Sequence, residues 1–407
     1  MRVLTKELSQ HTLRCLVRLC LPCLVWVHAT RFQTVFVAVA ALLRGQRLSA
    51  ARLGRAIAGP VAHKHKIKRI DRLLGNVPLQ QEQPLFYAAI VQRLLRDLPR
   101  PVLLLDWTKA VDGFYALVAA VPVDGRALPL YTQVHPEKKQ GNRRVHRHFF
   151  RSLAALLPAD CRPIVVMDAG FGSHVWKMLR QELSWDFVAR IRGIMKVCPI
   201  AGTDWIAATS LYPQATATAT DLGMWTACRN GAQGCYRLVQ SKQPPKPGHR
   251  WRKAPRSGTQ KSAKAAAQEP WLLATSLDTA TAAQIMAAYR LRMRIEETFR
   301  DAKNHRFGWS LREARATQAE RVEILLLLAA LAMLLVTIVG LMAEQAGAHR
   351  AYQANTMTVR RVLSHFVLGT FILQDECLPH HHVIPFPLGL APLHQRIREI
   401  AQPCGAG

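Results

Sequence analysis

The sequence predicts an α/β protein in which a mixed β-sheet is flanked by helices. A short apolar run followed by a hairpin of two apolar segments predicts antiparallel strands, and the strand–helix–strand pattern after it predicts parallel strands. Helical periodicity dominates the segments on either side. Hydrophobic residues make up 50% of the 407 residues and charged residues 20%. This composition excludes a disordered chain and supplies a large core.

The chain is strongly basic. It has 55 Lys and Arg against 26 Asp and Glu, a formal net charge of +29. Such an excess indicates a polyanionic partner, because neutralising phosphates releases counterions and needs no base-specific contact. Nucleic acid is the favoured partner, and an anionic membrane surface is the alternative.

The N-terminal region is predicted to be helical over residues 1–43. Ser49 can cap a helix that runs through Ala58, Gly59-Pro60 breaks it, and a basic helix follows over Ala62–Leu74. Helix, break and basic helix together resemble a DNA-binding helix-turn-helix. The alternative is a helical hairpin with a solvated basic face. The predicted DNA contacts are Lys64, Lys66, Lys68, Arg69 and Arg72.

The predicted sheet begins with a short buried strand at Val102–Asp106. Strands at Phe114–Val123 and Ala127–Val134 flank Asp124-Gly125, a dipeptide typical of a tight hairpin turn. A helix is expected over Arg144–Leu157, because its apolar residues share one face.

Next come a buried strand at Pro163–Asp168, a helix at Val175–Leu183 and a strand at Asp186–Ile191. Residues 195–280 then hold short β-prone runs, among them Gly234–Val239 and Trp271–Thr275. A stretch without hydrophobic periodicity, at about 241–268, predicts a flexible basic loop.

A long helix is predicted over Ala282–Lys303. The segment Ile324–Ala343 lacks charge and is long enough to span a membrane, although a fully buried core helix has the same appearance. A tail rich in Pro and His ends the chain.

Asp106 and Asp168 each end a run of aliphatic residues, which predicts that both carboxylates lie at one edge of the sheet. Two close carboxylates repel each other unless a cation lies between them, and hard oxygen ligands suit Mg²⁺ or Mn²⁺. A single such Asp would more simply cap the following turn.

The Ala282–Lys303 helix supplies a third acid. At about 100° per residue, Tyr289, Arg292, Glu296 and Lys303 share one narrow arc, whereas Glu297 lies off it. Glu296 is therefore the better candidate for a site. A solvent-exposed face with salt-bridge spacing is the alternative.

The spacing Tyr289-x2-Arg292-x3-Glu296-x6-Lys303 resembles the signature helix of insertion-sequence 4 family transposases, bacterial cut-and-paste enzymes of the DDE type. Five strings in the same order resemble its branch that excises through DNA hairpins: KRIDRLLGN (68–76), LDWT (105–108), MDAGF (167–171), EPWLLATSL (269–277) and RIEETFRDAK (294–303).

The resemblance implies an RNase H-like catalytic fold with a β-rich insertion and helical N- and C-terminal regions. The expected domains are a helical DNA-binding region (1–98), a catalytic core in two parts (99–194 and 281–345), the insertion with its basic loop (195–280), and a helical region with dimer contacts (346–407). It also implies that the apolar helix is buried, so no membrane association is expected.

The resemblance further implies that Asp106, Asp168 and Glu296 hold two Mg²⁺ ions, for which Mn²⁺ can substitute. Phosphate contacts are expected from Tyr289, Arg292 and Lys303, stacking on an everted base from Trp271, and contacts to the transferred strand from Arg190 and Arg192.

The expected partners are double-stranded DNA, as transposon ends and target, and a second copy of the chain in a paired-end complex. The expected location is the bacterial cytoplasm, at the nucleoid. The rival hypotheses are a metal-dependent nuclease without strand transfer and a catalytically inactive DNA-binding protein.

Overall fold

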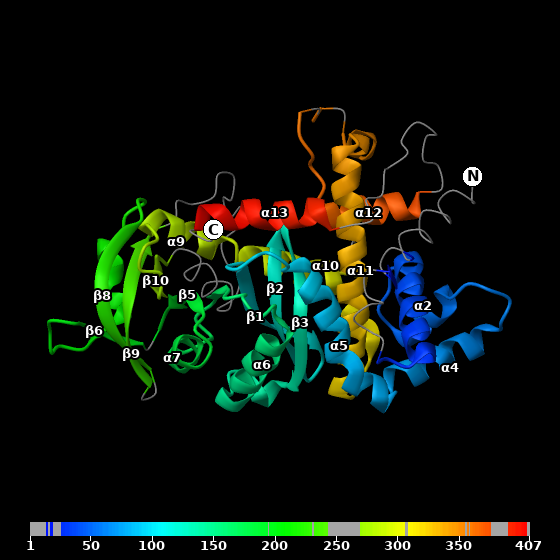
Figure 1. Cartoon of the computed structure of the whole chain (residues 1–407), viewed down its shortest axis with the longest axis horizontal. Helices are drawn as coiled ribbons and strands as arrows, with labels where there is room; N and C mark the ends of the chain where they lie inside the picture. Colours follow the sequence, from blue (N-terminus) through cyan, green and yellow to red (C-terminus); the bar gives the residue numbers. More distant parts are fainter. Residues whose placement is uncertain are drawn as a thin grey trace, which may run out of the picture.

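The computed structural model describes residues 14, 17–18, 26–193, 195–229, 232–242, 269–305, 308–354, 356–357, 359–375 and 390–404. Almost all of the predicted basic loop and much of the tail rich in Pro and His lie outside the described residues, as does most of the helix predicted before residue 26. Figure 1 shows a sheet that extends from β6 (Lys196–Pro199) to β3 (Arg126–Pro136), with α2 (Ala29–Gly45) and α4 (His63–Leu74) beyond α11 (Ala319–Gln345) at the other end.

One ten-stranded sheet runs through the molecule in the order β3-β2-β1-β4-β5-β10-β9-β8-β6-β7. Its first half consists of β1 (Val102–Val111), β2 (Phe114–Val123), β3 (Arg126–Pro136), β4 (Ile164–Met167) and β5 (Asp186–Ile191). β4 pairs in parallel with β1 and β5, whereas β2 pairs antiparallel with β1 and β3. The predicted RNase H-like mixed sheet is therefore confirmed.

The β-rich insertion extends this sheet. It contains β6 (Lys196–Pro199), β7 (Ile206–Ala207), β8 (Thr220–Arg229), β9 (Ala232–Ser241) and β10 (Trp271–Thr275). β10 joins the two halves, because it pairs antiparallel with β5 on one side and with β9 on the other. The sequence alone did not indicate this continuity.

Helices flank the central strands. α10 (Met293–Lys303) packs against β1 and β3, α11 (Ala319–Gln345) against β3, and α13 (Ala391–Ala401) against β2. In Figure 1, α6 (Arg143–Leu156) and α7 (Ser173–Glu182) lie on the opposite side from α13. These two layers enclose the strands that carry the acidic residues.

The N-terminal region folds as α2 (Ala29–Gly45), α3 (Ala50–Ala56), α4 (His63–Leu74) and α5 (Val77–Leu94). α3 ends two residues before the predicted Ala58, because Ile57 is already in an extended conformation. α4 begins one residue after the predicted start and ends at the predicted Leu74.

The predicted end of the first strand at Asp106 is wrong. β1 continues to Val111, because residues 107–109 and 111 pair with β2 up to the turn at Asp112-Gly113. The parallel pairing of β1 with β4 nevertheless ends at Leu105 and Met167. Asp106 and Asp168 are therefore the first residues beyond that ladder on each strand.

The single helix predicted over Ala282–Lys303 is also wrong. α9 (Ala282–Arg290) and α10 are separated at Leu291 and Arg292. Around this point the backbone N–H groups of Leu291, Arg292 and Arg294 bond to carbonyls three residues earlier, a tighter 3₁₀-type turn. Neither Gly nor Pro marks the break in the sequence.

α11 is the one helix among the described residues that is long and apolar enough to cross a membrane, and 89% of its most apolar 18-residue window is buried inside the protein. Its partners include β3, α5 and α12 (His365–Gln374). α11 is therefore buried as a core helix, which the resemblance to the transposase family implied.

Two glycines let α11 and α12 approach closely. A Cβ on Gly369 would lie 1.9 Å from the Val336 carbonyl oxygen, and one on Gly340 would lie 2.1 Å from the His365 carbonyl oxygen. Both contacts are with backbone atoms, which cannot rotate away as a side chain can. The helices can cross at this separation only with glycine at both positions.

We therefore expect Gly369→Ala to lower the free energy of unfolding by about 1–3 kcal/mol or more. Alanine by itself stabilises a helix by about 1 kcal/mol relative to glycine. The expected loss of stability therefore comes from the clash with the Val336 carbonyl oxygen. Thermal unfolding of the purified protein measures the effect. Gly125→Ala is the control, because a Cβ there would meet nothing within 4 Å; an equal melting temperature for both variants contradicts the prediction.

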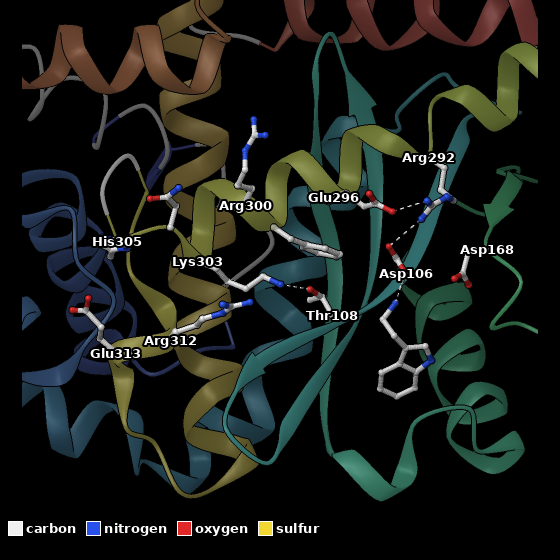
Figure 2. Close-up of a pocket in the computed structure, with 13 residues that line it drawn as sticks. Asp106, Thr108, Asp168, Arg292, Glu296, Arg300, Lys303, His305, Arg312 and Glu313 are labelled. Atoms are coloured by element: carbon white, nitrogen blue, oxygen red, sulfur yellow. Dashed lines mark hydrogen bonds and ion pairs between the residues drawn. The ribbon is translucent and has the colours of Figure 1, made fainter. Parts of the chain in front are cut away.

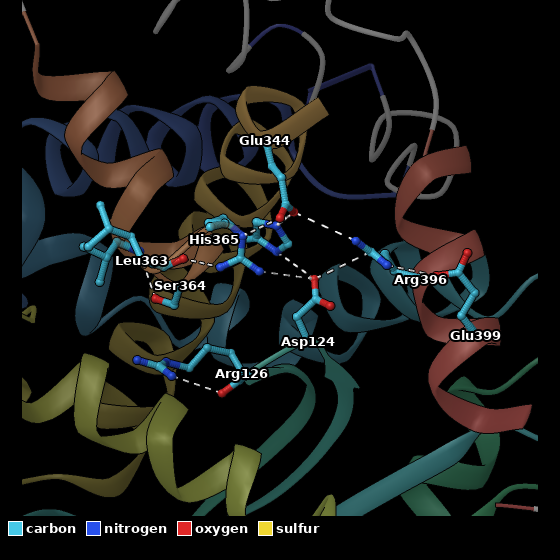
Figure 3. A network of polar contacts seen from close by, with 11 residues as sticks. Asp124, Arg126, Glu344, Leu363, Ser364, His365, Arg396 and Glu399 are labelled. Atoms are coloured by element: carbon cyan, nitrogen blue, oxygen red, sulfur yellow. Dashed lines mark hydrogen bonds and ion pairs between the residues drawn. The ribbon is translucent and has the colours of Figure 1, made fainter. Parts of the chain in front are cut away.

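A charged network joins the β2–β3 turn to the C-terminal helices (Figure 3). His365 Nδ1 lies 2.9 Å from Asp124 Oδ2, and its Nε2 lies 2.6 Å from Glu344 Oε2. The three ligand atoms lie within 4.8 Å of one another, a spacing that suits a metal ion. Arg361 Nε, however, lies 3.0 Å from Glu344 Oε1, and Arg396 reaches both carboxylates at 3.8–3.9 Å.

These cations already neutralise the pair of acids. Burial alone raises the pKa of Asp124 and Glu344, but the hydrogen bond with His365 and the arginine charges outweigh it and hold both pKa values below the ordinary range. Carboxylates that are stabilised in their ionised form stabilise the fold at neutral pH and lose that contribution as the pH falls through their lowered pKa values. The network therefore stabilises the contact between the β2–β3 turn and the C-terminal helices.

Candidate active site

Three acidic residues from distant parts of the chain line one pocket of about 790 Å³ (Figure 2). Asp106 lies within β1, Asp168 directly follows β4, and Glu296 lies in the first turn of α10. The sequence predicted that these carboxylates converge, and all three occur in the wall of this pocket.

The sheet explains why two of them meet. The parallel ladder ends at Leu105 and Met167, so Asp106 within β1 and Asp168 directly after β4 follow it at the same level. Local hydrogen bonds orient both: Asp106 Oδ1 accepts the Trp107 N–H at 2.8 Å, and Asp168 Oδ1 accepts the Gly170 N–H at 2.9 Å.

The pocket disfavours negative charge on Asp106, which is only 9% exposed. Burial, followed by the neighbouring charges of Asp168 and Glu296, raises the pKa of Asp106 to about 7, against the opposing effect of Arg292. Carboxylates held this close ionise together only when a cation neutralises them. The donor set consists of hard oxygen atoms and so fits a divalent ion such as Mg²⁺ or Mn²⁺.

A guanidinium group lies between two of the acids. Arg292 Nη1 is 3.3 Å from Asp106 Oδ2, and its Nη2 is 2.5 Å from Glu296 Oε1. Figure 2 shows the side chain reaching from the α9–α10 junction across both carboxylates, with Asp168 beside them. In this arrangement Arg292 supplies the positive charge that the acids require.

Lys303 lies farther along the same pocket, where its Nζ hydrogen-bonds Thr108 Oγ1. Burial and the nearby Arg312 charge lower the pKa of Lys303 to about 8, so it remains mostly protonated at neutral pH. Arg300 and Arg312 also line the pocket, and both are exposed. Neither arginine was among the predicted site residues; Arg300, one helical turn after Glu296, was predictable from the helical period.

Tyr289 and Trp271 lie outside the residues that line the pocket. Their rings meet edge to face with centroids 4.9 Å apart, and Tyr289 is only 3% exposed, whereas Trp271 is half-buried. Burial raises the pKa of the Tyr289 phenol, which therefore stays protonated. The pair is thus a rigid unit that presents part of the indole to solvent.

Arg190 and Arg192 share one carboxylate, that of Glu269, which was not among the predicted site residues. Glu269 Oε2 lies 2.6 Å from Arg192 Nε and 3.6 Å from Arg190 Nη2. Arg190 Nε and Nη2 are buried without a hydrogen-bond partner. Both arginines are therefore already paired, and Arg190 has little solvent access.

The predicted basic helix exposes four of its five candidate residues, namely Lys64, Lys68, Arg69 and Arg72. Lys66 differs from them. It is only 7% exposed, and its Nζ donates a hydrogen bond of 2.6 Å to the Gly59 carbonyl oxygen at the break between α3 and α4. This burial and hydrogen bond leave the Lys66 ammonium group little access to DNA, so the proposed contacts from this helix come from the four exposed residues.

A family model described as the transposase DDE domain matches residues 98–334. The match covers more than half of the chain and includes all three acids of the pocket. No curated protein matches the chain.

Proposed function

The chain belongs to the family of transposases with a DDE domain, which act on DNA with divalent metal ions, and we propose that it excises an insertion sequence by a cut-and-paste reaction. It binds the terminal inverted repeats, cuts both strands through a hairpin intermediate and joins the freed 3′-OH ends to target DNA. The observation that carries this proposal is the meeting of Asp106, Asp168 and Glu296 in one pocket.

In this proposal, Asp106, Asp168 and Glu296 hold two Mg²⁺ ions, for which Mn²⁺ can substitute. When bound, the ions activate the attacking hydroxyl and stabilise the leaving oxygen. The three carboxylates would hold these ions at the open pocket, where the reacting phosphodiester binds. Arg292 and Lys303 donate to its non-bridging oxygens, Arg as a fork and Lys as a point charge. Exposed Arg300 and Arg312 attract the flanking phosphates.

DNA contacts outside the pocket come from the remaining predicted residues. Lys64, Lys68, Arg69 and Arg72 on α4 bind the transposon end, within a DNA-binding region at 1–98. Arg190 and Arg192 contact the transferred strand by exchanging Glu269 for a phosphate. The catalytic core spans 99–194 and 281–345 around the insertion, and residues 346–407 supply dimer contacts in the paired-end complex. The protein works at the nucleoid of a bacterial cytoplasm.

Trp271 provides the stacking surface for an everted base. A hairpin across a blunt end is sterically tight, and flipping one base out relieves the crowding at a cost of a few kcal/mol. The half-buried indole is held by the buried Tyr289 ring, so it offers a rigid face to the base. Stacking of this kind contributes about 1–3 kcal/mol per base.

Trp271→Ala is expected to slow hairpin formation by roughly 5- to 100-fold while first-strand nicking stays near the wild-type rate. Denaturing gels with end-labelled DNA resolve the two steps. Trp205→Ala is the matched control, because Trp205 is a 41%-exposed indole on the insertion. Equal slowing of nicking and hairpin formation would remove the stacking role.

The proposal as a whole is tested by incubating the protein with candidate end DNA and Mg²⁺. Hairpin-capped fragments and joined products from a labelled 3′-OH end are expected. Cleavage without joined product would instead identify a nuclease, and binding without cleavage an inactive DNA-binding protein.

A further inference from the structure

A fully buried histidine outside the acid trio lies between the two segments that carry Asp106 and Asp168. His146, on α6, is 0% exposed. Its Nε2 lies 3.1 Å from the indole Nε1 of Trp107, and its Nδ1 lies 3.2 Å from Nε2 of His174. The two imidazole rings stack with an interplanar angle of 12°.

These contacts fix the protons on His146. An indole nitrogen can only donate, so His146 Nε2 must be the acceptor and carry no proton. The proton of the neutral ring is therefore on Nδ1, which donates to His174 Nε2. Burial lowers the pKa of His146 to about 3, which keeps the ring neutral. The chain of hydrogen bonds thus runs in one direction, from Trp107 through His146 to His174.

Both ends of this chain lead to an acid of the pocket. Trp107 directly follows Asp106, and its backbone N–H is the one that orients Asp106 Oδ1. His174 lies at the start of α7, on the segment that follows Asp168. Phe171, on the same segment, is 1% exposed, and its ring centroid lies 5.1 Å from that of His146. His146 therefore touches both segments at once.

The position of this bridge matters because the sheet no longer joins the two strands there. The parallel ladder between β1 and β4 ends at Leu105 and Met167, one residue before each Asp. Beyond that point the spacing of the two carboxylates depends on side-chain contacts. A bridge built from rigid rings and two directional hydrogen bonds restrains that spacing better than apolar packing alone.

We propose that His146 is a positioning residue that sets the spacing of Asp106 and Asp168 and thereby the affinity of the site for divalent cations. The inference rests on the proposed role of the acid trio. It assigns His146 no contact with substrate or metal.

The test is Mn²⁺ binding to the full-length protein without DNA, measured by electron paramagnetic resonance of the free ion. His146→Phe keeps an aromatic ring of similar size and loses both nitrogens, and it should weaken Mn²⁺ binding by about 10- to 100-fold. Trp107→Phe should have a similar effect. The double variant should bind no more weakly than His146→Phe alone, because that variant already breaks the hydrogen bond that Trp107→Phe removes. His146→Gln, which can still accept from the indole, should recover part of the affinity.

Phe150→Leu is the control for lost packing, because Phe150 is 0% exposed on the same helix and packs against Phe149 and Trp185. It should lower the melting temperature and leave Mn²⁺ affinity unchanged. Wild-type affinity in His146→Phe, or losses that simply add in the double variant, overturns the inference. Asp168→Ala, measured in parallel, distinguishes a failure of this inference from a failure of the proposed function. If Asp168→Ala also binds Mn²⁺ normally, the proposed metal-binding role of the acid trio is wrong.

Discussion

Glu296→Gln is expected to reduce DNA cleavage by about 10³-fold or more, and Asp106→Asn and Asp168→Asn should do the same. Loss of one ligand from a metal-dependent phosphoryl-transfer site costs several kcal/mol of transition-state stabilisation, and each 1.36 kcal/mol is tenfold in rate. Cleavage of end-labelled transposon DNA in single-turnover conditions measures the effect. Binding to the same DNA, measured by mobility shift, should remain, since the proposed α4 contacts are intact.

The chain offers a matched control one residue away. Glu297 is on the same helix, but its carboxylate pairs with Arg300 and lies 3.7 Å from Arg126 Nη1, and it does not line the pocket. Glu297→Gln should therefore cleave within a few-fold of the wild-type rate. Normal cleavage by any one of the three trio variants contradicts the assignment of that residue to the trio, and an equal loss in Glu297→Gln contradicts the choice of Glu296 as the third acid.

Local sequence patterns were sufficient to predict the position of many helices and strands. β2, β5 and β10 begin and end at the predicted residues, because each is an apolar run bounded by turn residues or a change of period. The meeting of Asp106 and Asp168 was predictable for a similar reason: two aliphatic runs that are each followed by Asp bring the two carboxylates together when the runs pair in parallel.

Tertiary contacts account for the features that were not predictable. Arg292 and Asp106 are 186 residues apart in the sequence, so no local pattern indicates their contact. The burial of Lys66 depends on a carbonyl that only the α3–α4 break exposes. His146 is an intermediate case. It precedes Phe149 and Phe150 by three and four residues, so helical spacing puts it on the apolar face, but its partners Trp107 and His174 come from other elements.

Arg292→Met is expected to have opposite effects on metal binding and on cleavage. Without DNA, Mn²⁺ should bind more tightly, because the variant removes the positive charge that now lies against Asp106 and Glu296. Cleavage should nevertheless slow by about 10²- to 10³-fold, because the proposed donor to the reacting phosphate is lost. Mn²⁺ affinity and single-turnover cleavage are measured on the same preparations. Arg294→Met is the control, since Arg294 is half-buried and lies near Asp124 instead of the pocket.

The pH dependence of metal binding gives the same prediction a second readout. Mn²⁺ binds the ionised carboxylate, so protons compete below the pKa of Asp106, which is about 7 in the free protein. Arg292 lowers that pKa, and its removal should raise it. The pH below which Mn²⁺ affinity begins to fall should therefore move upward in Arg292→Met, and stay in place in Arg294→Met. An unchanged profile together with unchanged affinity would mean that Arg292 does not neutralise the acids in solution. The guanidinium would then act on the phosphate alone, and the free site would depend on metal ions for all of its positive charge.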